Sequence, residues 1–105
     1  MTTKLIAGKT VQVSDEGFMT NPAEWDNAIA EAVAGEEGIP VLSPAHWRVI
    51  EFCRTDGLAS GKAPTLRRIT SQTGLTTKDM FTLFPKGPAK KVARISGLGK
   101  PEGCV

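Results

Sequence analysis

The sequence predicts a mainly α-helical fold, in which one small helical domain carries an N-terminal β-hairpin, a helix-turn-helix-like segment and a flexible C-terminal arm. Two short apolar stretches flank Gly8-Lys9, and farther on apolar residues recur at helical spacing between capping residues. The chain ends in a stretch rich in glycine and proline. With 105 residues it has room for one modest core. We expect the helical domain at residues 1–97 and the arm at 98–105.

The N-terminal third predicts a hairpin and then a helix. Residues 4–13 contain two candidate strands around Gly8-Lys9. Asn21-Pro22 is typical of a helix start, with Asn21 as the cap, and Gly35 predicts the helix end. The residues expected to form the core face of this helix are Trp25, Ala28, Ile29, Ala32 and Val33.

A second helix is predicted from the Ser43-Pro44 cap to about Asp56-Gly57. Cys53 falls on its apolar face, and there we interpret it as a buried small hydrophobic residue. His46 lies in the first turn of the helix. We expect it to make a structural contact, because no nucleophile or carboxylate pair stands beside it in the sequence.

Three shorter helices complete the prediction. The third begins at Pro64 and ends at Gly74, and the fourth begins at Thr76 or Thr77 and ends before Pro85. The fifth runs from Pro88 to about Ser96.

Composition narrows the class of protein. The sequence has no apolar run near the ~18 residues of a membrane span, and residues 1–20 lack the layout of a signal peptide. We therefore expect a cytoplasmic protein with reduced thiols and no membrane insertion. Two cysteines and a single histidine make a poor metal set, so we expect neither a metal nor a cofactor.

The charge is unevenly distributed along the chain. The net charge is +2, but residues 1–61 carry a net −5 and residues 62–105 a net +7. Such asymmetry favours an acidic partner surface or a nucleic acid, while a solvated basic face without a partner is the simplest alternative.

Cys104 stands one residue from the chain end, which is an unusual place for a packing residue. The neighbouring Glu102 and the terminal carboxylate oppose ionisation of the thiol, while Lys100 favours it. The sequence shows no base or oxyanion stabiliser beside it. The pattern therefore favours a carrier of the sulfurtransferase type over a stand-alone catalyst, with an incidental terminal cysteine as the alternative.

Two other patterns compete with the thiol. Residues 65–81 are typical of a helix-turn-helix DNA-binding segment, in which Arg67, Arg68 and Lys78 would contact phosphates. The apolar stretch 80–84 argues against exposure of that second helix in a DNA groove. Residues 86–91 suggest a phosphate site at a helix N-terminus but lack the glycine spacing of a P-loop.

Several motifs resemble the DsrC/TusE family. At the C-terminus these are residues 83–90, Arg94-Ile95-Ser96-Gly97-Leu98, Lys100-Pro101 and Gly103-Cys104-Val105. Upstream, residues 15–18, the Trp25 helix and residues 42–47 are also similar. The resemblance covers nearly the whole chain.

The resemblance implies a small helical fold whose penultimate cysteine, here Cys104, carries sulfur. Members of the TusE kind pass persulfide sulfur from an upstream relay toward a tRNA 2-thiouridine-forming enzyme. Members of the DsrC kind have a second cysteine eleven residues earlier and work with dissimilatory sulfite reductase and a membrane complex. That position is Ala93 here, so a two-thiol trisulfide or an arm-to-helix disulfide cannot form there. The chain is either a natural one-cysteine member or one in which this cysteine was replaced. The segment between the third and fourth helices is shorter than is usual in the family.

We therefore predict a sulfur carrier that holds persulfide sulfur on Cys104 and passes it between partner proteins. The partners would be a sulfurtransferase donor and an acceptor such as sulfite reductase or a tRNA-thiolating enzyme. The alternatives are a DNA-binding regulator and a sulfite-reductase-associated subunit. The cations expected to guide partner docking are Lys86, Lys90, Lys91, Arg94 and Lys100.

Overall fold

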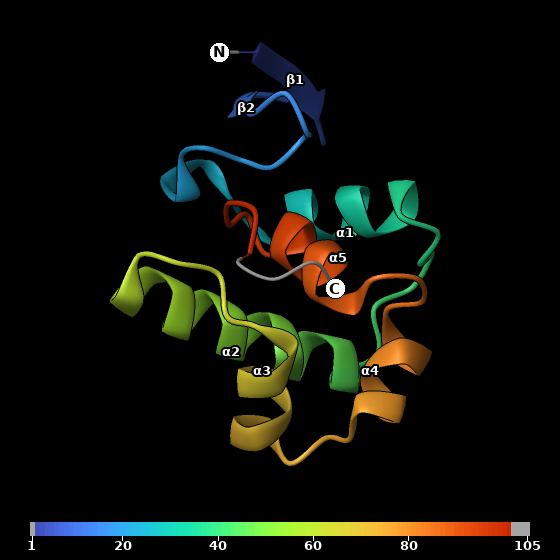
Figure 1. Cartoon of the computed structure of the whole chain (residues 1–105). Helices are drawn as coiled ribbons and strands as arrows, with labels where there is room; N and C mark the ends of the chain where they lie inside the picture. The colour runs from blue at the N-terminus through green and yellow to red at the C-terminus, as the bar shows by residue number, and fades with distance from the viewer. Residues whose placement is uncertain (1, 102–105) are drawn as a thin grey trace.

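A computed structural model describes residues 2–101 of the chain. The elements in order are the strands β1 (Thr2–Ile6) and β2 (Lys9–Val13), the 3₁₀ turn η1 (Pro22–Glu24), and the helices α1 (Asn27–Glu36), α2 (Pro44–Ser60), α3 (Leu66–Thr73), α4 (Thr77–Leu83) and α5 (Pro88–Ile95). Figure 1 places the hairpin at one end, α3 and α4 at the other, and α1 beside α5 between them. The predicted fold class is confirmed.

The hairpin is antiparallel, with a register that pairs Thr2 with Val13 and Ile6 with Lys9. Its two-residue turn is Ala7-Gly8, one position earlier than expected, and both residues have positive φ, as the favoured hairpin turns require. A two-stranded hairpin alone is marginally stable in water. Here Ile6, Val11 and Val13 are buried, so the hairpin gains its stability by packing on the domain, where β1 contacts α1.

The predicted first helix is wrong in its start. Asn21 caps only the short turn η1, and the chain then becomes extended at Trp25 and Asp26. Asp26 caps α1 instead, since its Oδ1 accepts the Ile29 N–H at 2.9 Å. The buried face also differs from the predicted one, because Ala28 is exposed and Ala30 is buried.

The predicted end of the second helix is also wrong. Gly57 lies inside α2, and the helix continues to Ser60 before Gly61 ends it with a φ of 79°. Gly57 serves packing instead, because a Cβ atom there would lie 2.8 Å from Cδ1 of Leu98. The glycine is therefore required by a close approach of the C-terminal segment and not by a turn.

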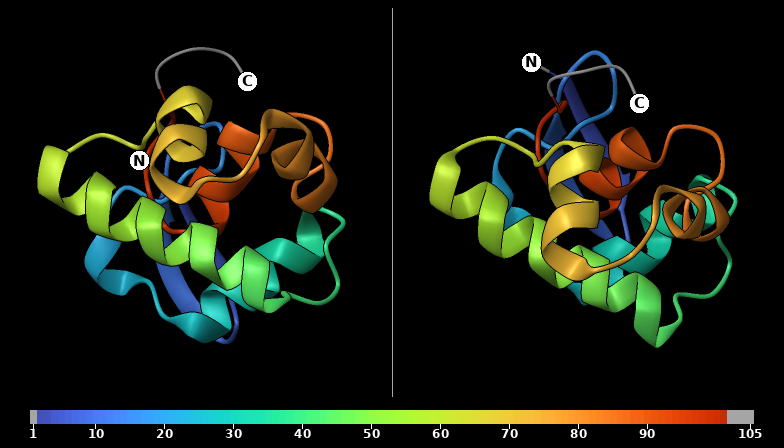
Figure 2. Two further views of the ribbon diagram at one scale, coloured as in Figure 1. Left: turned by 90° about the horizontal axis from the view of Figure 1, so that it is seen from below. Right: turned by 60° about the horizontal axis from the view of Figure 1, so that its bottom comes forward.

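The helix-turn-helix-like segment is present. Thr65 and Thr76 cap α3 and α4 through their side chains, and Gly74 ends α3 with a φ of 79°. The predicted third helix thus begins two residues later than Pro64. In both views of Figure 2, α3 lies beside the long α2, with α4 following it.

Helix α5 runs through the middle of the domain, in contact with α1, α2 and α4. Two residues in the left-handed region precede it, because Lys86 and Gly87 both have positive φ before Pro88 begins the helix. Its buried residues are Pro88, Ala89, Val92, Ala93 and Ile95. Because α5 is central, the chain that follows it leaves from a packed part of the molecule. Across residues 2–101, no helix is both long and apolar enough to cross a membrane.

Candidate functional site

The described start of the C-terminal arm is held by the end of α5. The Leu98 N–H donates to the Ala93 carbonyl at 2.9 Å, and the Gly97 N–H donates to the Arg94 carbonyl at 3.2 Å. This is the Schellman pattern, with Gly97 as its left-handed residue at a φ of 70°. We call residues 95–98 the arm root. Cys104 itself lies outside the described residues.

Trp25 closes over the arm root from the segment before α1. Its Nε1–H donates to the Ile95 carbonyl at 2.8 Å, and a Cβ atom on Gly97 would lie 2.6 Å from the Trp25 ring. Only glycine therefore fits at position 97, both for its positive φ and for this contact. Figure 1 shows the red segment after α5 beside the blue η1 turn that precedes Trp25.

Arg54 of α2 completes the arrangement around the arm root. One guanidinium nitrogen donates to the Ser96 carbonyl at 2.8 Å and another to the Pro22 carbonyl at 3.3 Å. Its Cζ lies 4.1 Å from the centre of the Trp25 ring, which is cation–π distance. Partial burial lowers the pKa of Arg54 from its ordinary value, although arginine stays protonated at neutral pH.

Two residues of the segment 98–101 are covered as well. Leu98 is buried among the core side chains against Gly57, and Pro101 is buried, while Gly99 and Lys100 are exposed. A cavity of about 260 Å³ lies next to this segment. Its lining includes Pro22, Gly57, Leu58, Ala63, Leu98 and Gly99.

Three of the five predicted docking cations bind this chain's own groups. Arg94 pairs with the Glu37 carboxylate at 3.1 Å, donates to the Glu16 carbonyl at 2.9 Å, and stacks on Phe18 at 4.8 Å. Lys91 donates to the Glu37 carbonyl at 2.7 Å. Lys100 pairs with the Glu16 carboxylate at 3.0 Å, and both side chains of that pair are about half exposed.

The other two docking cations have no such partners. Lys86 is exposed in the turn before α5, and Lys90 is half-buried on the helix. Neither side chain forms an ion pair or hydrogen bond within residues 2–101. Sequence alone gave no means to separate these two from the other three.

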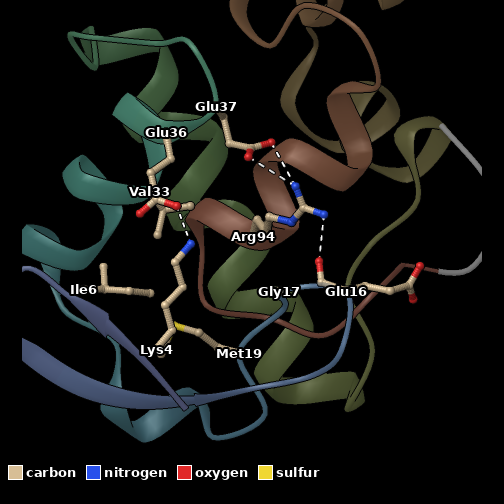
Figure 3. A pocket seen from close by; sticks show the side chains of 9 residues that line it. All are labelled: Lys4, Ile6, Glu16, Gly17, Met19, Val33, Glu36, Glu37 and Arg94. Carbon is tan, nitrogen blue, oxygen red and sulfur yellow. Dashed lines mark hydrogen bonds and ion pairs between the residues drawn. The ribbon is translucent and has the colours of Figure 1, made fainter. Parts of the chain in front are cut away.

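A cavity of about 170 Å³ beside Arg94 has walls of both charges (Figure 3). Arg94 reaches Glu37 and Glu16 across it, and Lys4 pairs with Glu36 on the opposite side. The charges thus largely satisfy one another. We interpret the cavity as a structural joint between the hairpin loop, α1 and α5.

Two residues that sequence analysis interpreted as structural are structural. Cys53 is completely buried, and burial together with the nearby Asp56 carboxylate raises the pKa of its thiol above the ordinary range. His46 accepts the Ser43 N–H on Nδ1 at 3.0 Å, so its Nε2–H donates to the Leu83 carbonyl at 2.8 Å. Among residues 2–101, no group of three or more His, Cys, Asp or Glu is placed to hold a metal ion.

The residues considered for DNA contact are only partly free. The Arg68 guanidinium pairs with the Asp56 carboxylate, and its Nε lies 2.9 Å from each of the two oxygens. This pairing lowers the pKa of Asp56. A phosphate would have to displace that carboxylate. Arg67 and Lys78 are the cations of the segment that form no ion pair within residues 2–101.

The fold therefore defines a small helical domain built around a central helix, at whose end residues 95–98 are held by Trp25 and Arg54. Comparison with known proteins gives the family: the model for "DsrC like protein" matches residues 5–105. This chain belongs to the DsrC-like family.

Curated relatives and a solved structure agree with that assignment. The chain is 37% identical to the dissimilatory-type sulfite reductase subunit gamma of Nitratidesulfovibrio vulgaris, over 93% of each chain. It is 32% identical to sulfurtransferase TusE of Escherichia coli K12, covering 96% of this chain and 98% of that one. The solution structure of Allochromatium vinosum DsrC matches with a TM-score of 0.84 and 34% identity, over 98% and 97% of the two chains.

Proposed function

We propose that this protein is a sulfur carrier that holds persulfide sulfur on Cys104 and passes it between partner proteins in the cytoplasm. The observation that carries the proposal is the family match, which extends to residue 105 and so includes the penultimate cysteine. Relatives named sulfurtransferase TusE support the same chemistry. The arm root supports it as well, because residues 95–98, upstream of Cys104, are hydrogen-bonded to the end of α5, to Trp25 and to Arg54.

The chemical step is a transfer of sulfane sulfur. The Cys104 thiolate attacks the outer sulfur of a donor persulfide, and the donor's S–S bond breaks. The electron pair leaves with the donor thiolate, while a new S–S bond forms on Cys104. No external oxidant or reductant is required, and an acceptor thiolate can repeat the step to remove the sulfur.

The chain's other thiol does not compete for this role. A buried thiol with a raised pKa is almost entirely protonated at neutral pH, and the thiolate is the nucleophile. Residue 93 is a buried alanine, 2% exposed, and therefore supplies no second thiol at that position. The carrier therefore works with a single thiol, which would keep the sulfur as a persulfide until an acceptor removes it.

The proposal is tested by loading the protein with a cysteine desulfurase and free cysteine as the sulfur source. Intact-mass spectrometry is expected to show one added sulfur on the wild type and on Cys53→Ala, and none on Cys104→Ser. Reduction with a thiol reagent should remove the addition. Sulfur that persists on Cys104→Ser, or a wild type that takes up none, would contradict the proposal.

The match to a sulfite reductase gamma subunit favours one further candidate, a subunit that docks its arm on a sulfite reductase. Co-purification with such a reductase from the native source is the expected outcome. Retention by a tRNA-thiolating enzyme instead would place the carrier in the other pathway. The comparisons reported above give no support to the DNA-binding alternative.

A further inference from the structure

The arm root is fastened by side chains from two distant parts of the chain. Trp25 and Arg54 donate hydrogen bonds to the carbonyls of Ile95 and Ser96, respectively. The two side chains also stack on each other, and Arg54 holds the Pro22 carbonyl beneath them. We infer that Trp25 and Arg54 are positioning residues for sulfur transfer, which set the direction in which the arm delivers Cys104 to a partner. This inference rests on the proposed function.

The short length of the remaining chain limits the region that the Cys104 thiol can reach. Three peptide units separate Pro101 from Cys104, and each spans at most about 3.6 Å, so their Cα atoms lie within roughly 11 Å of each other. The region that the thiol can reach is therefore centred on Pro101. Any rotation at residues 95–98 moves that whole region relative to a partner docked on the domain surface.

The chemistry of Arg54 also favours a directional role. Its hydrogen bonds go to backbone carbonyls, and within residues 2–101 it has no carboxylate partner. A partly buried guanidinium that bonds to backbone carbonyls fixes particular backbone positions, which an apolar side chain would not do. One hydrogen bond to the Ser96 carbonyl and one to the Pro22 carbonyl, together with the stacked Trp25 ring, hold the arm root against the segment before α1.

The matched control lies in the same helix. Arg48 of α2 also donates one guanidinium hydrogen bond to a backbone carbonyl, that of Thr73, at 2.9 Å. It contacts α3 and not the arm root. Arg54→Gln and Arg48→Gln therefore each remove a guanidinium hydrogen bond from α2 to a backbone carbonyl, but only Arg54→Gln removes contacts to the arm root.

The first experiment compares two sulfur donors for each variant, a persulfidated cysteine desulfurase and inorganic polysulfide. Arg54→Gln is expected to slow uptake from the protein donor by about tenfold, because misplacement of reacting groups is costly. Uptake from polysulfide should stay at the wild-type rate, since a small donor needs no docking. Arg48→Gln should match the wild type with both donors.

Three results would overturn the inference. These are wild-type uptake by Arg54→Gln from the protein donor, an equal loss with polysulfide, or an equal loss in Arg48→Gln. If Arg54→Gln does not fold, Trp25→Phe is the second variant, because it keeps the stacked ring and removes only the Nε1–H donor to Ile95. The same criteria then apply to it.

A second measurement is independent of sulfur chemistry. Spin labels on Cys104 and on an exposed Lys78→Cys in α4 report the distance from the arm tip to the domain by pulsed electron paramagnetic resonance. The distance distribution should broaden in Arg54→Gln and remain as in the wild type in Arg48→Gln. An unchanged distribution in Arg54→Gln would refute the inference even if the wild type accepts sulfur. A wild type that accepts no sulfur would refute the proposed function, whatever the distance distributions show.

Discussion

At the scale of single residues, packing fixes the environment of the Cys53 thiol. Cys53 has no exposed surface, and Asp56 one turn later adds a negative charge nearby. Both effects oppose the thiolate, so burial turns this cysteine into a small apolar side chain. The inertness of Cys53 therefore follows from its location in the core and not from its residue type.

This environment predicts a loss of stability at alkaline pH. The folded-state pKa of Cys53 is raised, while an unfolded thiol titrates near ~8.5. Above that pH the unfolded chain loses a proton that the folded chain keeps, so the free energy of unfolding should fall by about 1.4 kcal/mol per pH unit. Below pH 8 the group should add no pH dependence.

Urea unfolding at pH 8, 9 and 10 measures this effect, with Cys53→Ala as the control. The variant should be less stable than the wild type at pH 8, because it leaves a small cavity. It should lose less stability between pH 9 and 10 than the wild type does. Parallel losses in the two proteins would show that other groups cause the alkaline dependence.

At the scale of elements, one histidine connects the start of α2 to the end of α4. His46 caps the start of α2 through the Ser43 N–H and donates to the last residue of α4, Leu83. Its ring also meets the Phe84 ring edge-on, with centroids 5.1 Å apart. The helix-turn-helix-like segment is thereby fixed to the domain at its far end, and through α4 to the start of α5.

We therefore expect His46→Ala to lower the free energy of unfolding by about 2 kcal/mol, because it removes a cap and leaves the Leu83 carbonyl without its partner. His46→Gln should recover part of that loss, since glutamine at this position can complete the capping box. Thermal unfolding followed by circular dichroism measures both. An alanine variant as stable as the wild type would refute the structural role.

At the scale of the whole molecule, the acidic N-terminal half neutralises part of the basic C-terminal half. Glu16 and Glu37 engage Arg94, Lys91 and Lys100 through side chains or carbonyls. The predicted basic docking face is consequently smaller than the sequence suggests. We propose that Lys86 and Lys90 are the cations that a partner meets first.

The double variant Lys86→Glu/Lys90→Glu should slow association with the protein sulfur donor by about tenfold at low salt, and the difference should shrink as salt increases. Stopped-flow measurements of association across a salt series test this. The control is Arg67→Glu/Lys78→Glu, which makes the same change of net charge on α3 and α4. Equal slowing in the control would show that net charge alone, and not this face, steers the partner.

Local signals in the sequence predicted most elements but misplaced some of their ends. Asn21 and Asp26 are both good caps, and only packing selects Asp26 for α1. Gly57 has the form of a stop signal, yet it lies inside α2 because Leu98 requires the space. A glycine needed for close approach and a glycine needed for a turn are identical in sequence.

Some features of the candidate site are likewise readable in the sequence, and others depend on tertiary contacts. The penultimate cysteine, the glycine at the end of α5 and the basic character of the C-terminal half are all visible in the chain itself, since each depends on neighbouring residues. Sequence analysis missed Arg54, and it placed Trp25 in a helix. Their roles at the arm root come from contacts 42 and 70 residues away along the chain.

By itself, then, the sequence determined that this is a small helical domain, and it contains a glycine-rich stretch with a cysteine after the last helix. Those features are local, because caps, periodicity and motifs act over a few residues. Only the tertiary structure decided which cations are free, which cysteine is inert and what holds the arm. Those outcomes depend on which distant side chains come together, as Arg94 does with Glu37 across 57 positions, and no local pattern encodes such a pairing.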